Sequence, residues 1–175
     1  MTRGVGLGPD QGSESFSLYI KLDYPVSLLI EEEFVIKLVY IFKFLWKLKK
    51  IEHLAGRLRE LKYFNFIQKL QFYVFNEVIG NFSIEFPDFE SFCFDVFKKN
   101  INKRLDSIMK GLFINTRAKK TEMMLFSLER YLVDKGTSNR NVNEDEVVRA
   151  LNDFCEYSKG ELVGTYLFNL QECLQ

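Results

Sequence analysis

The side chains best suited to chemistry are one histidine and two runs of carboxylates. His53 is the single histidine, and no other His or Cys stands three or four residues away, as a helical zinc site would require. No nucleophile motif accompanies it, so a histidine-dependent triad is not indicated. The carboxylates at 31–33 and 144–146 each open an apolar-periodic segment, where negative charge complements a helix dipole. The sequence therefore predicts a non-enzymatic protein with no cofactor and no metal.

Glycines and cysteines add no further chemistry. Gly4, Gly6 and Gly8 alternate within residues 1–15, but no Gly-Lys-Ser/Thr follows them, as it would in a phosphate-binding loop. Because residues 1–15 also lack apolar periodicity, we expect them to form a flexible leader. The three cysteines, at 93, 155 and 173, are far apart and odd in number, which is typical of free thiols in a reducing compartment.

Charge is unevenly distributed along a chain whose net charge is zero. Between Lys37 and Lys69 there are nine basic and two acidic residues, a net charge of +7, whereas residues 141–175 carry seven acidic and two basic ones, a net charge of −5. A basic helical face interleaved with aromatics could bind nucleic-acid phosphates. It could equally meet an acidic protein surface, or be a solvated face whose long side chains cover apolar neighbours.

Composition predicts one folded domain. The chain has 175 residues, of which 47% are hydrophobic and 27 are aromatic, with only 3 prolines, and this excludes an intrinsically disordered chain. The most apolar stretch, residues 34–48, contains Lys37, Lys43 and Lys47, so it is not a membrane span of about 20 apolar residues. We therefore expect no membrane partner.

Apolar spacing of three and four residues predicts an all-α bundle of about five helices. We expect helices over about 31–61, 63–82, 89–112 and 119–133, and a fifth from Asn143 onward; Asp88 is the expected N-cap of the third. Residues 16–30 are β-branched and aromatic and contain Pro25, which predicts a short extended segment beside the helices, with a short strand as the alternative. Residues 16–175 are expected to form one domain.

Two stretches of this sequence resemble a known family. LDYPVSLLI at 22–30, followed by a helix carrying Phe42, Phe44, Leu45, Trp46, Lys49, Lys50 and Glu52, is similar to the start of the C-terminal domain of gamma-tubulin complex components, the spindle pole body proteins. The family pattern in that helix reads F-x-F-L-W-x-x-K-R/K-x-E. FIQKLQFYVFNEV at 66–78 resembles a second family pattern, on which Gln71, Tyr73, Glu77 and Val78 fall.

A weaker third match runs from Asp88 to Ile114. Phe97 matches the family's phenylalanine there, while the family's histidine is absent and Asp95 and Val96 stand near its place. The family's long polar insertion between its first two helices is almost absent, and its N-terminal half is missing from this chain.

The resemblance implies a helical domain that binds gamma-tubulin and holds it in a microtubule-nucleating complex. The implied partners are gamma-tubulin and other gamma-tubulin complex components. The implied location is the cytoplasm and cytoskeleton, at the microtubule-organising centre or spindle pole. A nucleic-acid partner is not expected, although a basic nucleic-acid-binding module and a generic helical scaffold remain the alternatives.

Within the matched stretches, residue type separates a predicted core from a predicted interface. Phe42, Leu45 and Trp46 are expected to lie in the core. Gln71 and Tyr73 are candidates for a buried polar network that fixes helix register. The residues that we predict to contact gamma-tubulin are Lys47, Lys49, Lys50, Glu52, Gln71, Tyr73 and Glu77.

Overall fold

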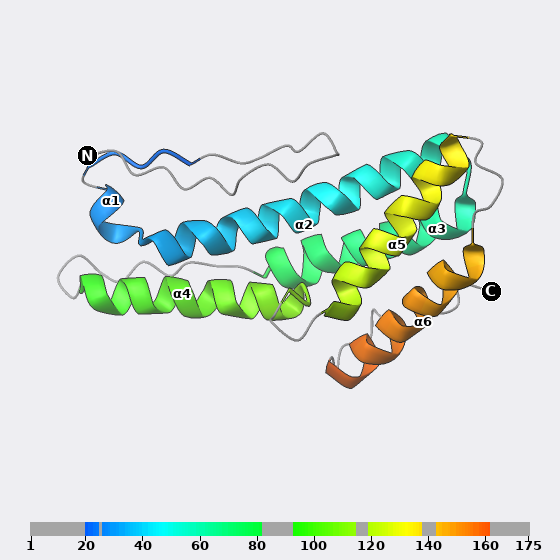
Figure 1. The fold of residues 1–175 in the computed structure, drawn as a ribbon. Coiled ribbons are helices and arrows are strands. Elements are labelled where there is room, and N and C mark those ends of the chain that lie inside the picture. Colours follow the sequence, from blue (N-terminus) through cyan, green and yellow to red (C-terminus); the bar gives the residue numbers. More distant parts are fainter. Residues whose placement is uncertain (1–19, 25, 82–92, 115–118, 138–142, 162–175) are drawn as a thin grey trace.

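The computed structural model describes residues 20–24, 26–81, 93–114, 119–137 and 143–161, and most of these residues are helical (Figure 1). The elements are α1 (Val26–Leu29), α2 (Glu32–Arg57), α3 (Leu61–Phe72), the π-helix η1 (Tyr73–Ile79), α4 (Phe94–Gly111), α5 (Lys119–Gly136) and α6 (Glu144–Glu161). The predicted all-α class is therefore confirmed. The predicted leader at 1–15, the N-cap at Asp88 and the chain beyond residue 161 lie outside the described residues.

The long helix α2 is the central element of the fold, because α3, α4 and α5 all pack against it (Figure 1). Its buried residues recur every three or four positions: Val35, Val39, Ile41, Phe44, Leu48, Ile51 and Ala55. Helix α6 packs on α5, and α4 also contacts η1. An ion pair between Lys37 and Asp106, 2.7 Å apart, joins the first half of α2 to α4.

Aromatic contacts connect the smaller helices to one another. The Phe66 and Phe154 rings meet edge to face with centroids 6.4 Å apart, and this contact joins α3 to α6. Phe113, just after α4, packs edge to face against Phe154 at 5.5 Å. Tyr63 of α3 contacts Tyr131 of α5 in the same way. The core is thus one cluster to which all five of the longer α-helices contribute.

Two helices end in a Schellman motif whose left-handed residue is not glycine. Arg59 follows α2 with φ 57°, and the amide of Glu60 donates to the carbonyl of Ala55. Phe113 follows α4 with φ 58°, and the amide of Ile114 donates to the carbonyl of Met109. A left-handed non-glycine residue costs roughly 1–2 kcal/mol. Burial of the Phe113 ring against Phe154 offsets that cost, and the turn at Arg59 lets α3 fold back along α2.

The prediction that Trp46 is a core residue was wrong. Its side chain is 46% exposed, and Phe42, only half-buried, stacks on it with ring centroids 6.4 Å apart. At about 100° per residue, Trp46 lies roughly 200° around the helix from both Phe44 and Leu48, which are the buried positions. Leu45 is half-buried and packs against the core from its edge. The three residues predicted as core anchors thus lie one to two positions away from the buried residues Ile41, Phe44 and Leu48.

Several predicted boundaries also differ. Residues 26–29 form the short helix α1 and are not extended, whereas residues 20–24 are non-helical. Helix α2 ends at Arg57, four residues before its predicted end, because the Schellman turn intervenes. The predicted helix over 63–82 is divided: α3 begins at Leu61, and from Tyr73 the backbone continues as the π-helix η1.

The π-helix positions η1 against the end of α4. Its hydrogen-bond spacing is seen where the amide of Gly80 donates to the carbonyl of Phe75 at 2.8 Å. Gly111 allows the close approach, since a Cβ there would lie 2.9 Å from Cγ1 of Val78. The Tyr73 hydroxyl donates to the Gly111 carbonyl at 3.2 Å. Segments of π-helix are rare and often occur at functional sites, which draws attention to this part of the surface.

Candidate functional site

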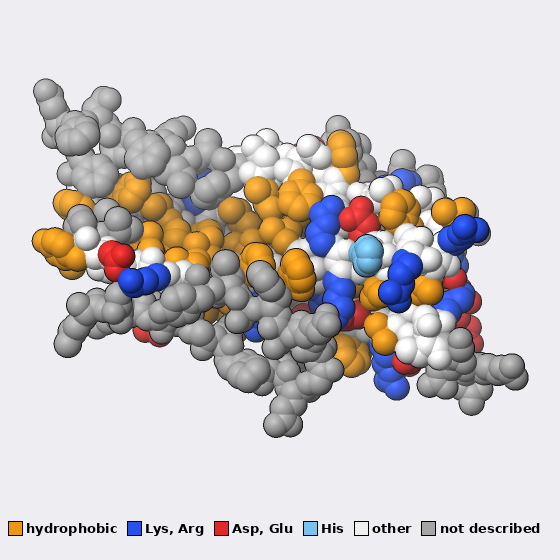
Figure 2. All heavy atoms as spheres, turned by 90° about the horizontal axis from the view of Figure 1, so that it is seen from above, with side chains coloured by type: hydrophobic (Ala, Val, Ile, Leu, Met, Phe, Trp, Pro, Cys, Tyr) orange, Lys and Arg blue, Asp and Glu red, His pale blue; other side chains and the backbone are white. Residues whose placement is uncertain are grey.

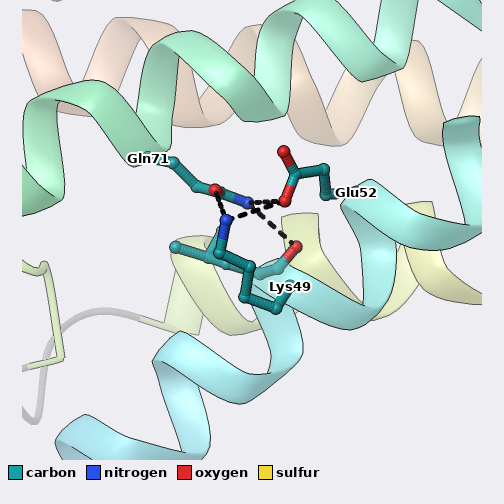
Figure 3. A network of polar contacts seen from close by, with 4 residues as sticks. Lys49, Glu52 and Gln71 are labelled. Carbon is teal, nitrogen blue, oxygen red and sulfur yellow. Dashed lines mark hydrogen bonds and ion pairs between the residues drawn. The ribbon is translucent and has the colours of Figure 1, made fainter.

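Three of the predicted interface residues form one polar network between α2 and α3 (Figure 3). Lys49 Nζ donates to Gln71 Oε1 at 2.6 Å and to Glu52 Oε2 at 2.9 Å. Gln71 Nε2 donates to Glu52 Oε2 at 3.1 Å and to the backbone oxygen of Leu48 at 3.4 Å. The network therefore joins side chains that lie about twenty residues apart in the sequence.

The helix period explains how these side chains meet. Lys49 and Glu52 stand three residues apart, so both project from one face of α2 toward the last turn of α3. Gln71 is only 5% exposed, and a buried amide needs hydrogen-bond partners. Lys49, Glu52 and Leu48 supply them, so the network fixes how α3 sits along α2. Gln71 therefore has the buried polar role that was the alternative for it, and its burial leaves little of its side chain accessible for the predicted partner contact.

The network also stabilises the charge on Glu52. Partial burial opposes ionisation of this carboxylate, but the hydrogen bonds from Lys49 and Gln71 outweigh burial and hold its pKa below the ordinary 4.5. A carboxylate with a lowered folded-state pKa stabilises the fold above its unfolded-state pKa, and that contribution disappears as the pH falls through the lower value.

We expect Glu52→Gln to lower the free energy of unfolding by about 1–2 kcal/mol at pH 7. The difference from the parent chain should shrink as the pH falls below about 4.5, because the parent Glu52 then becomes protonated too. Urea unfolding at pH 7, 5 and 3 measures this. Glu156→Gln, an exposed carboxylate on α6, serves as the control and should have little effect. A Glu52→Gln deficit that stays constant down to pH 3 would contradict this account.

Lys47 and Lys50 contact a different helix, α5. Both reach the same carboxylate of α5: Glu129 lies 3.3 Å from Lys47 Nζ and 3.0 Å from Lys50 Nζ. Lys47 Nζ also lies 5.6 Å from the ring centroid of Phe126. The three predicted lysines are therefore divided, since Lys49 faces α3 while Lys47 and Lys50 hold α5 on α2.

Tyr73 and Glu77 lie on η1. Tyr73 is buried, and burial, aided by the nearby charge of Glu77, raises the pKa of Tyr73 to about 12. Its hydroxyl bonds the Gly111 carbonyl, so this residue joins η1 to α4. Glu77 is half-buried.

An exposed aromatic beside the network went unnoticed in the sequence. Phe75 of η1 is 41% exposed, and Lys49 Nζ lies 5.8 Å from its ring centroid. It belongs to the run FYVF at 72–75, in which every residue is apolar or aromatic, and the helical period alone does not show which of those aromatics faces outward. Figure 2 shows that apolar side chains dominate one end of the α2 face, whereas charged side chains surround the pale-blue histidine at the other end. This histidine is His53, which is exposed.

A pocket lies where α2, the end of α4 and the start of α5 meet. Its volume is ≈ 530 Å³, and its lining includes Tyr40, Lys43, Phe44, Lys47, Phe113, Ile114, Thr121, Glu122, Met123, Leu125 and Phe126. No sequence motif indicated it, because its walls come from three elements that only the fold brings together.

The parts of the chain that the structure describes contain no group of three or more His, Cys, Asp and Glu side chains that could hold a metal ion. None of their helices is long and apolar enough to cross a membrane. Comparison of the chain with protein-family models, curated proteins and solved structures finds no match. Any family assignment therefore depends on the sequence motifs and on how their residues lie in space.

Proposed function

We propose that this chain binds gamma-tubulin and holds it, without catalysis, in a microtubule-nucleating complex at the microtubule-organising centre or spindle pole. The observation that carries the proposal is the spatial convergence of the three stretches that resemble gamma-tubulin complex components. Lys49 and Glu52 of the first stretch bond Gln71 of the second. Tyr73 of the second bonds Gly111 of the third.

This convergence supports the proposal because the residues that meet are those on which the resemblance depends. Gln71 and Tyr73 are two of the four residues that fall on the second pattern, and both make contacts to another matched stretch. Residues matched by chance have no reason to form buried hydrogen bonds with one another. If α2, α3, η1 and α4 pack together as the corresponding segments of the family do, contacts between these residues are expected.

The proposal assigns the partner contact to the surface around Lys49 and Phe75. Lys47, Lys50 and Tyr73 are engaged within the fold, whereas Lys49 is more than half exposed and Phe75 is 41% exposed. An exposed aromatic beside a lysine is a favourable centre for a protein interface, in which aromatic anchors contribute most of the binding energy.

The nucleic-acid alternative gains no added support from the structure. Much of the basic charge between Lys37 and Lys69 is neutralised by carboxylates: Lys37 by Glu33 and Asp106, Lys47 and Lys50 by Glu129, and Lys49 by Glu52. A surface that binds a phosphate backbone needs a continuous array of available cations.

The proposal is tested by capture of co-expressed gamma-tubulin on the tagged chain. We expect the parent chain to retain gamma-tubulin, and Phe75→Ala to reduce capture at least about tenfold, as loss of a 1.4 kcal/mol contact would. Phe94→Ala, which removes another exposed aromatic at the start of α4, is the matched control and should capture normally.

Circular dichroism should show that both variants keep their helical content. No capture by the folded parent chain would refute the proposed function. Normal capture by Phe75→Ala would refute only the proposed contact surface.

A further inference from the structure

Lys43 differs from the other lysines of α2. Lys37, Lys47, Lys49 and Lys50 each lie within 3.3 Å of a carboxylate oxygen. Among the described residues, Lys43 has no ion-pair partner, although its side chain is half-buried. It lines the ≈ 530 Å³ pocket between α2, the end of α4 and the start of α5.

The pocket surrounds that lysine with mainly apolar side chains. Tyr40, Phe44, Met123 and Phe126 are among its lining residues, and its volume lies within the range of about 300–1,000 Å³ typical of ligand pockets. Three of these side chains, Tyr40, Met123 and Phe126, are exposed between 43% and 62%. Large exposed apolar side chains gathered at a concave site are typical of binding surfaces.

Polar groups in the pocket favour an acidic ligand. An ammonium group among apolar side chains loses part of its hydration, and a carboxylate placed beside it compensates for that loss. Glu122 lines the pocket too, but it is exposed and forms no ion pair with Lys43. Thr121, also in the lining, is buried, and its hydroxyl has no hydrogen-bond partner among the residues that the structure describes.

We propose that this pocket binds a partner-protein segment that inserts a large apolar side chain and carries an Asp or Glu beside it. The apolar side chain would displace water from Tyr40, Met123 and Phe126, and the carboxylate would pair with Lys43. This mode resembles the anchoring of short peptide segments in apolar grooves. The inference does not depend on the proposed gamma-tubulin function, because the pocket lies away from Phe75 and none of its lining residues belongs to α3 or η1.

The probe is a blocked hexapeptide, Glu-Asp-Leu-Phe-Asp-Glu, compared with its neutral form, Gln-Asn-Leu-Phe-Asn-Gln. The chain has four methionines, and ¹³C-methyl labelling gives one NMR signal for each. Met123 lines the pocket, so its signal reports occupancy, and Met123→Leu assigns that signal. We expect saturable shifts of Met123 with the acidic peptide, and binding at least about tenfold weaker for the neutral one.

Lys43→Gln should bind both peptides equally weakly, whereas Lys103→Gln, an exposed lysine of α4 outside the pocket, should behave like the parent chain. Circular dichroism checks that both variants are folded. Absence of a saturable Met123 shift would overturn the proposal. Equal affinity of the parent chain for the two peptides, or an undiminished preference in Lys43→Gln, would overturn it too.

Discussion

Phe66→Ala is expected to lower the free energy of unfolding by about 3–5 kcal/mol. Phe66 is fully buried on α3, and its ring contacts Phe154 of α6 edge to face. Truncation removes apolar contacts and leaves a cavity at the junction of two helices that α2 does not bring together. For a chain of this length, the midpoint of thermal unfolding should fall by roughly 6–20 °C. Thermal and urea unfolding followed by circular dichroism measure the change.

Trp46→Ala is the matched comparison for this prediction. Tryptophan is the larger side chain, but Trp46 is 46% exposed. Its truncation should therefore cost clearly less than that of Phe66, about 1 kcal/mol, since the side chain gives up only part of its buried area. A Trp46→Ala variant that unfolds as readily as Phe66→Ala would contradict the position of the buried stripe on α2.

Glu129→Lys is expected to destabilise the fold by about 2–3 kcal/mol. The Glu129 carboxylate is mostly buried and binds both Lys47 and Lys50. Reversing its charge removes two attractions and places three ammonium groups together between α2 and α5. Exposed ion pairs are worth at most about 1 kcal/mol, whereas breaking a buried one costs about 3–5, and this site lies between those cases. The decrease in unfolding temperature should diminish in high salt, which screens charge repulsion.

Two further variants isolate the electrostatic cause. Glu129→Gln removes the attraction without adding repulsion, so its effect should be about half as large. Lys50→Glu added to Glu129→Lys restores opposite charges and should recover most of the lost stability. A double variant no more stable than Glu129→Lys alone would show that side-chain shape, and not charge, decides the effect.

The same ion pairs determine which variants are informative about function. Charge reversal at Lys47 or Lys50 would weaken the packing of α5 on α2, so loss of partner binding would have two causes. Phe75 and Lys43 avoid this difficulty. Phe75 is partly exposed and Lys43 has no ion pair among the described residues, so their substitution breaks no ion pair between helices.

The sequence by itself determined the fold class and most of the helices. Spacing of apolar residues by three and four predicted α5 near its observed first residue, and the acidic residues after Asn143 did the same for α6. These features are local, since the helix period and terminal charges act within a few turns. The sequence left two roles open for Gln71, a buried polar contact and a partner contact, and its burial in the structure favours the first.

Only the tertiary structure decided which face of α2 is buried. Helix α2 carries apolar side chains around much of its circumference, so its sequence allowed Trp46 or Leu48 as the core residue. Phe44 and Leu48 are buried because α3, α4 and α5 cover the face of α2 on which they lie. The π-helical backbone of η1 likewise has no local period in the sequence to reveal it, and its packing against Gly111 depends on a residue more than thirty positions away.

The candidate sites depend on that assembly for the same reason. The sequence predicted that Lys47, Lys49 and Lys50 would all contact the partner, but Glu129 of α5 binds two of them and Gln71 of α3 binds the third. The partners come from helices distant in the sequence, and charge pairing depends on distances in space. The pocket beside Lys43 is likewise formed by three elements and has no signature in any one of them. Residue type and spacing thus determined the helices, whereas contacts between distant helices decided which side chains remain available to a partner.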